Sequence, residues 1–190
     1  MVLTNYFLKK EIRKLIGKAS ERPHQYRSLN DIKHILFVCD SKDWDVIRHC
    51  IEKLKTMNKT VHTAIFAISK KDLPTWYSNY LLLRADQDVD FFGFPDHGLQ
   101  KQFYNLPADL LIDFTSSQSS PLYYMLLKHP STFKAGIKYS DDSAYDFSII
   151  PPKEEHPLPY FFDQLINYLM TIHSKTEATA VDADLIFSNT

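Results

Sequence analysis

Two aspartates occupy positions where carboxylates can do chemistry, because each closes an apolar run of the kind that forms a buried strand. Asp40 follows the run 34–39, and Asp113 lies near the end of the run 109–114. If the two runs are neighbours in one sheet, the carboxylates could share a Mg²⁺ ion through water or form a pair in which one pKa is raised. Aspartates at strand ends also begin turns and cap helices without any ligand. Asp40 and Asp113 are therefore the candidate catalytic residues, with a turn-forming role as the alternative.

A run of hydroxyl side chains follows the second of these strands and precedes a predicted helix. Ser116, Ser117, Ser119 and Ser120 come before Pro121, a residue that suits the first turn of a helix. The free N–H groups of a helix N-terminus, together with hydroxyls, can hold a phosphate or a carboxylate. Serines at this position also cap helices without binding anything. The four serines are the candidate anion-binding residues.

The placement of glycine excludes the common nucleotide-binding loops. The chain has four glycines, at positions 17, 93, 98 and 136, and they form neither GxGxxG nor GxxxxGK[ST]. A loop that wraps a phosphate needs glycine, because only a residue without Cβ lets the main chain approach the oxygens. The sequence also lacks a GxSxG turn, an HExxH helix and any zinc-ligand spacing. No metal and no cofactor are therefore predicted, and the sequence favours a protein that is not an enzyme.

Positive charge is concentrated at the N-terminus. Residues 1–27 carry seven Lys or Arg and two Glu, a net of +5, whereas the rest of the chain carries a net of -6. Apolar residues recur at helical spacing between the cations, which predicts a basic amphipathic helix that ends near Gly17. Either this helix packs its apolar stripe on the domain and solvates its cations, or it docks to RNA, an anionic lipid surface or a protein groove. In the second interpretation the partner-binding residues are Lys9, Lys10, Arg13, Lys14 and Lys18.

The segments that must position these residues alternate between strand and helix. Apolar and β-branched runs predict strands at 34–39, 60–68, 110–114, 133–138 and 146–150. A further strand lies at 80–83 or at 89–94, although 76–83 could instead be helical. Helical periodicity predicts helices at 44–57, at 95–103, from 121 onward and at 157–172. Such alternation builds a three-layer, mostly parallel α/β Rossmann-like sheet with flanking helices, preceded here by the basic N-terminal helix.

Length and composition predict one domain between two terminal segments. The 190 residues are 44% hydrophobic and 24% charged, which is typical of a globular chain. We expect the basic helix and a linker at 1–27, a single α/β domain at 28–173 and a disordered tail at 174–190. Cys39 and Cys50 occur in no CxxC pair and are predicted to be small buried hydrophobes. Without a signal-peptide pattern or an apolar run of about 20 residues, a cytoplasmic location is expected.

Several segments resemble an uncharacterised bacterial family, a domain of unknown function. The similar segments are Asp109–Phe114, Pro121–Tyr124, Phe133–Gly136, Tyr145–Ile150 and Gln164–Ile172, with looser similarity back to the first strand. This resemblance implies no activity. A weaker similarity, carried by Ile112-Asp113, the polar turn after it and Lys134–Gly136, is to the N-terminal lobe of heptosyltransferase-type glycosyltransferases. Those enzymes bind their sugar nucleotide mainly through a second lobe, so the similarity implies an α/β fold and speaks against an intact transferase.

Two functions are consistent with these features. In the first, the chain is a non-catalytic α/β binding module whose basic helix docks to an anionic partner, with RNA or the ribosome ahead of a membrane. In the alternative, a small enzyme or sensor binds a nucleotide or a phosphorylated sugar at the carboxyl ends of the strands, where open parallel sheets bind ligands. The four serines would then hold phosphate, and the two aspartates would act as metal ligands or as a base.

Overall fold

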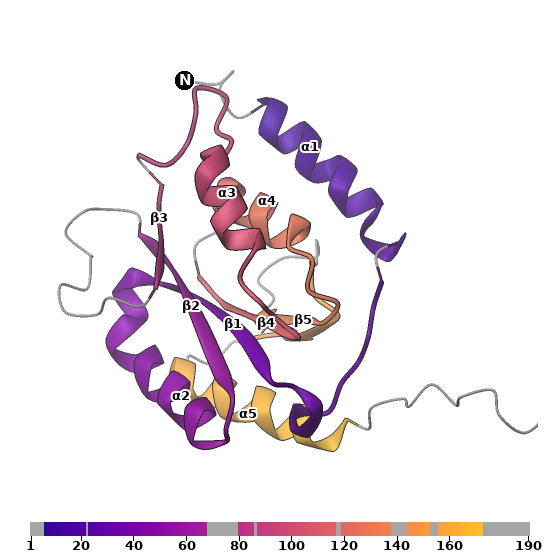
Figure 1. The fold of residues 1–190 in the computed structure, drawn as a ribbon, viewed down its shortest axis with the longest axis vertical. Helices are drawn as coiled ribbons and strands as arrows, with labels where there is room; N and C mark the ends of the chain where they lie inside the picture. The colour runs from indigo at the N-terminus through magenta and orange to yellow at the C-terminus, as the bar shows by residue number, and fades with distance from the viewer. Residues whose placement is uncertain are drawn as a thin grey trace, which may run out of the picture.

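Six parallel strands form one sheet at the centre of the fold (Figure 1). The computed structural model describes residues 6–21, 23–67, 80–85, 87–116, 119–137, 144–152 and 156–172. In chain order the strands are β1 (His34–Asp40), β2 (Thr60–Ala67), β3 (Leu81–Arg84), β4 (Leu110–Phe114), β5 (Lys134–Ile137) and β6 (Phe147–Ile149). Their order across the sheet is β3-β2-β1-β4-β5-β6, so the direction in which strands are added reverses between β1 and β4.

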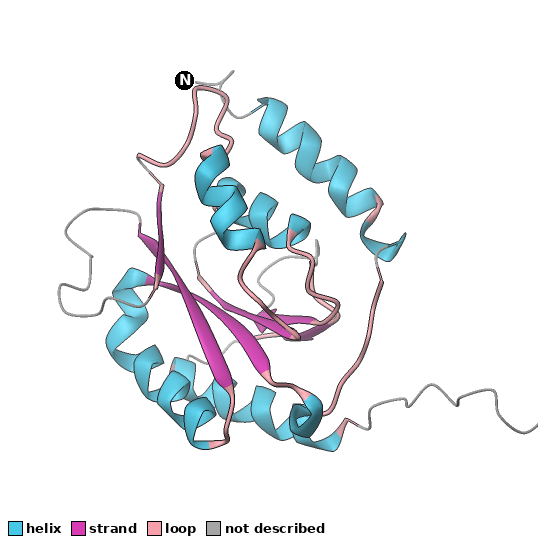
Figure 2. Cartoon of the chain, viewed as in Figure 1, coloured by secondary structure: helices cyan, strands magenta, loops and turns pink. Residues whose placement is uncertain are grey.

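Helices cover both faces of this sheet, as Figure 2 shows. On one face lie α2 (Trp44–Thr56) and α5 (Leu158–Thr171), and on the other lie α3 (His97–Tyr104) and α4 (Ser120–Lys128). The first helix, α1 (Tyr6–Gly17), packs against α4. Short 3₁₀ turns lie at Ala19–Glu21, Leu29–Asp31 and Ser41–Asp43. The predicted three-layer α/β Rossmann-like fold is therefore confirmed.

Residues of β1 alternate between two hydrophobic cores, which is why this strand reads as an unbroken apolar run. Phe37 and Cys39 belong to the core under α2 and α5, whereas Leu36 and Val38 belong to the core under α4. The neighbouring strand β4 places Asp113 opposite Val38, and all of its residues are buried. The prediction that these two runs are adjacent, enclosed strands is confirmed.

Of the two segments predicted as alternatives for a further strand, 80–83 and 89–94, the first forms β3. Leu81–Arg84 pairs with β2, whereas Val89 forms an isolated antiparallel bridge with Pro95. Residues 76–79 and the predicted tail at 174–190 lie outside the described residues. Cys39 and Cys50 are free and buried, as predicted, and burial raises the pKa of the Cys50 thiol to about 11. Among the helices that the structure describes, none has the length and apolar character needed to cross a bilayer.

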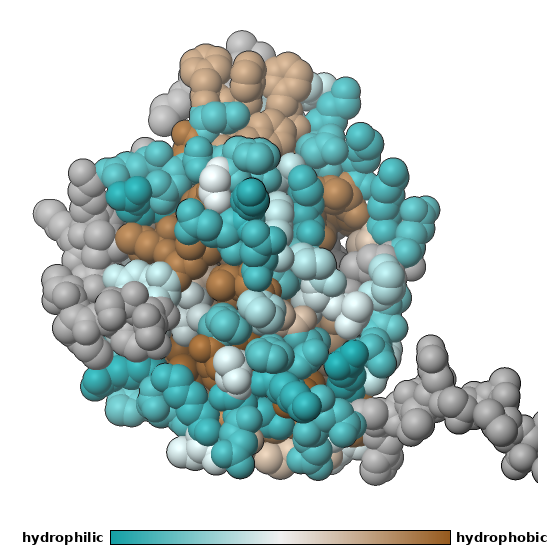
Figure 3. Space-filling view, viewed as in Figure 1, coloured by the Kyte–Doolittle hydropathy of each residue, from teal (hydrophilic) through white to brown (hydrophobic). Residues whose placement is uncertain are grey.

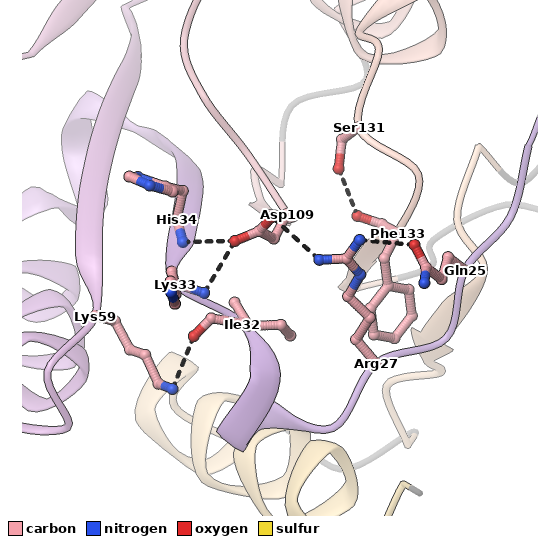
Figure 4. A network of polar contacts seen from close by, with 9 residues as sticks. All are labelled: Gln25, Arg27, Ile32, Lys33, His34, Lys59, Asp109, Ser131 and Phe133. Carbon is pink, nitrogen blue, oxygen red and sulfur yellow. Dashed lines mark hydrogen bonds and ion pairs between the residues drawn. The ribbon is translucent and has the colours of Figure 1, made fainter. Parts of the chain in front are cut away.

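The predicted linker is bonded to the amino-terminal edge of the sheet through Asp109 (Figure 4). The Asp109 carboxylate accepts hydrogen bonds from the backbone N–H groups of Lys33 and His34, both at 2.9 Å, and from the Arg27 guanidinium at 3.3 Å. Burial alone would raise the pKa of Asp109, but these bonds and the Arg27 charge outweigh it and lower the pKa. Because the Gln25 N–H also donates to the Thr132 carbonyl, the chain after α1 has a fixed path to the sheet.

Candidate functional site

The helix α1 lies with its apolar stripe on the domain and its cations toward solvent. Leu8 and Ile12 are buried in the same core as Leu122 and Met125 of α4. The residues predicted to bind a partner are all exposed, and we call them the basic face: Lys9, Lys10, Arg13, Lys14 and Lys18. The interpretation that the stripe packs on the domain therefore holds for the apolar residues. Docking concerns the cations and stays a prediction.

Three cations of the basic face follow one another along α1 and the turn after it. Lys10 and Lys14 are four residues apart on α1, so their side chains leave the helix about 6 Å apart along its axis, and Lys18 follows in the turn directly after the helix. The other two cations form a shorter line beside it. Lys14 lies 3.5 Å from Glu11, and because both side chains are exposed, this ion pair is weak and leaves the ammonium group accessible. Cations in such a line can contact successive phosphates of a nucleic-acid strand.

The predicted carboxylate pair lies where the strand order reverses, the place at which open parallel sheets bind ligands. Asp40 and Asp113 are 2% and 3% exposed. Oδ2 of Asp40 accepts from the N–H and the hydroxyl of Ser116 at 2.8 and 2.9 Å. Oδ1 of Asp113 accepts from the N–H and the hydroxyl of Thr115 at 2.9 and 2.8 Å. These bonds hold the loop after β4 against both strands, which is the turn-forming role predicted as the alternative.

Asp113 has a second hydrogen-bond partner, Tyr145, which lies just before β6. The hydroxyl of Tyr145 donates to its other oxygen, Oδ2. Burial raises the pKa of Asp113 to about 6, the bonds from Tyr145 and Thr115 act in the opposite direction, and the nearby Asp40 carboxylate raises it further. The pKa of this carboxyl therefore lies above that of an exposed aspartate, and the group takes up a proton at a higher pH.

Asp113→Asn should change how stability depends on pH. The folded-state pKa of about 6 lies above the value of 3.8 for an unperturbed aspartate, so the folded protein binds more protons than the unfolded chain between these pH values. The parent therefore loses stability from this group as the pH rises through that window. Asn cannot ionise and removes the loss, so we expect the melting temperature of the variant minus that of the parent to rise through the window and then level off. Asp163→Asn, on the exposed surface of α5, is the control. A difference that stays flat with pH would contradict this account.

The serines predicted to bind an anion are placed less favourably for that role. Ser116 donates both of its groups to Asp40, so its hydroxyl meets a carboxylate that would repel a phosphate. Ser119 precedes α4 and makes no side-chain capping bond, Ser120 begins the helix, and Ser117 lies outside the described residues. Within the described ranges, no group of three or more His, Cys, Asp or Glu side chains could hold a metal ion. A nucleotide or sugar-phosphate site here stays a prediction.

Sequence reasoning missed the loop between β3 and α3. Phe91 and Phe92 lie at its surface, 78% and 46% exposed, and the Phe92 ring meets the Phe7 ring of α1 edge to face at 5.5 Å. The signal was available as two adjacent phenylalanines between Asp90 and Gly93, in a stretch that we interpreted as a candidate strand. The structure places these rings next to the basic face.

One protein-family model matches residues 5–172, and it is described as a family of unknown function. The matched range includes α1, so the basic helix is part of the unit that the family model describes. No curated protein matches the chain. The resemblance to a heptosyltransferase lobe therefore has no support beyond the shared class of fold.

Proposed function

Because the chain belongs to DUF6913, a family of unknown function from which no activity transfers, we propose a function from the geometry. The protein is a non-catalytic α/β module that docks to RNA through the basic face of α1. The observation that carries the proposal is that four cations on α1, and a fifth in the turn directly after it, are exposed while the apolar stripe of the helix is already buried against the domain. The cations are therefore not needed to hold the helix in place and are available to a partner.

The distribution of charge favours one orientation of an anionic partner. The net charge is +5 over residues 1–27 and -6 over the rest of the chain. A polyanion is attracted to the side that carries α1 and repelled by the remainder of the surface, so association is steered toward the basic face.

The position of α1 is fixed before any partner arrives. Its stripe packs on α4, and the chain after it is bonded to the sheet through Arg27 and Asp109. A cationic surface that is already ordered loses less conformational entropy on binding than a flexible basic tail does. Lysine contacts to the phosphate backbone carry little sequence information, so we expect docking that depends weakly on base sequence.

The test is the salt dependence of binding to a short single-stranded uridine RNA, measured by fluorescence anisotropy. If all five cations contact phosphates, log Kobs should fall with log salt at a slope of about −3.5. A variant with all five residues of the basic face replaced by Gln should bind about 100-fold more weakly at about 50 mM salt, with a much shallower slope. Its melting temperature should stay close to that of the parent, because the apolar stripe is unchanged.

A second five-residue variant controls for net charge. It replaces exposed lysines outside α1 by Gln: Lys33, Lys42, Lys53, Lys55 and Lys101. It changes the net charge equally but should bind RNA almost as well as the parent. Equal losses in both variants, or no RNA binding by the parent at low salt, would refute the proposal. Binding to anionic phosphatidylserine vesicles without binding to RNA would assign the basic face to a membrane and would also refute it.

A further inference from the structure

Four aromatic side chains gather at one end of the basic face, where solvent reaches each of them. We call Tyr6, Phe7, Phe91 and Phe92 the aromatic cluster; their exposed fractions are 58%, 53%, 78% and 46%. Edge-to-face contacts at 5.5 to 5.6 Å join Tyr6 to Phe7, Phe7 to Phe92 and Phe92 to Phe91. Figure 3 shows apolar side chains gathered at the top of the molecule, where Figure 1 places the start of α1 and the loop before α3. Clustered exposed rings of this kind mark an interaction surface.

The loop that carries half of this cluster is held in one shape by its own hydrogen bonds. Oδ1 of Asp90 accepts from the N–H groups of Phe92 and Phe94 at 2.8 and 2.9 Å, and the Asp90 N–H donates to the Phe94 carbonyl at 2.8 Å. Gly93 adopts a positive φ of 84°, a conformation that glycine reaches without strain. The rings of Phe91 and Phe92 are thus presented outward by an ordered turn.

A groove separates this loop from α1. Its volume is about 670 Å³, and it is lined by Phe7, Lys10, Glu11, Lys14, Phe92 and Phe94. This volume lies within the range of small-ligand sites, and the lining combines three phenylalanines with two lysines. Phe7 stands three residues before Lys10 and seven before Lys14, so it continues the line of cations along α1.

We propose that this groove is a stacking site for unpaired bases of single-stranded RNA, with the flanking phosphates on the line of Lys10, Lys14 and Lys18. The inference rests on the proposed function and adds the kind of RNA and the place where its bases bind. Proteins that bind single strands combine a cationic track for the backbone with aromatic faces for the bases. Both parts lie here on adjoining, ordered elements.

The arrangement of the cations favours an RNA strand over a lipid surface. Lys14 lies about 6 Å along the helix axis from Lys10, away from the aromatic cluster, and Lys18 follows in the turn after α1. A membrane that received the rings would lie beyond the start of α1 and would leave the far end of this line unused. A strand that stacks a base beside Phe7 can continue along the line toward Lys18.

Replacing Glu11 tests this inference through the direction in which the RNA affinity changes. It lines the groove beside Lys10 and Lys14 and is the acidic side chain among the lining residues. Glu11→Gln removes a negative charge from the proposed path of the phosphates, so we expect the affinity for single-stranded RNA to rise a few-fold. A fall in affinity would place the phosphates elsewhere.

The main test compares single-stranded uridine RNA with an RNA duplex of the same length, using anisotropy. We expect the parent to bind the single strand at least tenfold more tightly, because bases in a duplex are not free to stack on protein. Phe92→Ala should weaken binding to the single strand about tenfold and leave the salt slope unchanged. Phe92→Tyr keeps an aromatic face and should retain the affinity, whereas Phe92→Leu should behave like Ala. Tyr168→Ala, at a ring 53% exposed on α5, is the matched control and should have no effect.

The outcomes separate this inference from the proposed function. Suppose that replacing the basic face abolishes RNA binding, that Phe92→Ala binds RNA as tightly as the parent, and that the parent binds the duplex as tightly as the single strand. Docking through the basic face then holds, and the stacking site is wrong. If no RNA binds at low salt, both fail. If Phe92→Ala instead loses binding to phosphatidylserine vesicles, or to a protein partner, while its RNA affinity is unchanged, the cluster serves that partner and the inference is overturned.

Discussion

Lys134→Met should lower the free energy of unfolding by about 4 kcal/mol, the largest effect that we expect from a single replacement. Lys134 is 1% exposed on β5, and its ammonium group donates to the carbonyls of Leu126 and Leu127 at 2.7 and 3.1 Å. These carbonyls belong to the last turn of α4, where the helix itself supplies no partner. Met fills similar space but donates nothing, so two buried acceptors lose a charged donor. A drop of about 10 °C in Tm is the corresponding thermal shift.

Two measurements separate this account from a nonspecific loss of packing. Burial and then the Lys134 charge lower the pKa of His129 to about 4, so the pKa of His129 should rise in the variant, as read by NMR titration. Lys101→Met, at an exposed lysine of α3, should leave Tm almost unchanged. An unchanged or higher Tm for Lys134→Met would show that the cost of burying the ammonium group exceeds what its hydrogen bonds contribute.

Gly136→Ala should lower the free energy of unfolding by about 3 kcal/mol, because the new methyl group has no room. A Cβ at Gly136 would lie 2.7 Å from the backbone oxygen of Asp113 and 3.1 Å from the ring of Tyr145. The first contact is to the main chain of the neighbouring strand β4, which cannot rotate away as a side chain can. β5 must therefore move from β4, and the bond from Tyr145 to Asp113 is disturbed with it.

Gly17→Ala is the matched control for this replacement. No atom lies within 4 Å of a Cβ built at Gly17, and alanine is a better helix former than glycine. We expect chemical denaturation to show an unchanged or slightly raised stability for Gly17→Ala and a clear loss for Gly136→Ala. Equal stabilities for the two variants would mean that β4 and β5 can separate at little cost. Because a Cβ at Gly136 would contact Asp113 and Tyr145, the stability loss of Gly136→Ala also measures how rigidly the Asp113 carboxylate is held.

Elements whose evidence is local were predicted well. The runs at 34–39 and 110–114 became β1 and β4 within a residue or two, because a strand buried on both faces must be apolar at every position. The helices at 44–57 and 157–172 became α2 and α5 for a similar reason, since each has one apolar face. β3 was ambiguous because both candidate segments are short and apolar, and pairing with β2 decided between them.

Side chains whose role depends on a distant partner were not predicted. In the sequence, Lys134 is an ordinary charged residue at the end of a predicted strand. It is buried because the last turn of α4 packs over it and accepts its hydrogen bonds. The phenylalanines of 91–94 were interpreted as a candidate strand, because nothing nearby in the sequence shows that Asp90 folds the segment into a turn beside α1. The position of the two carboxylates at the carboxyl ends of adjacent strands was predicted correctly, but their hydrogen-bond partners were not predicted.

The residue pattern alone determined the class of fold, the separation of charge between the N-terminal segment and the rest, and the absence of glycine-rich phosphate loops. Each of these depends on residue types and on spacing within a few turns or strand lengths. Tertiary structure alone decided that Ser116 bonds to Asp40, that Tyr145 bonds to Asp113 and that Phe92 meets Phe7. Periodicity fixes which face of an element is buried, whereas the partner on that face depends on how segments far apart in the chain cross one another.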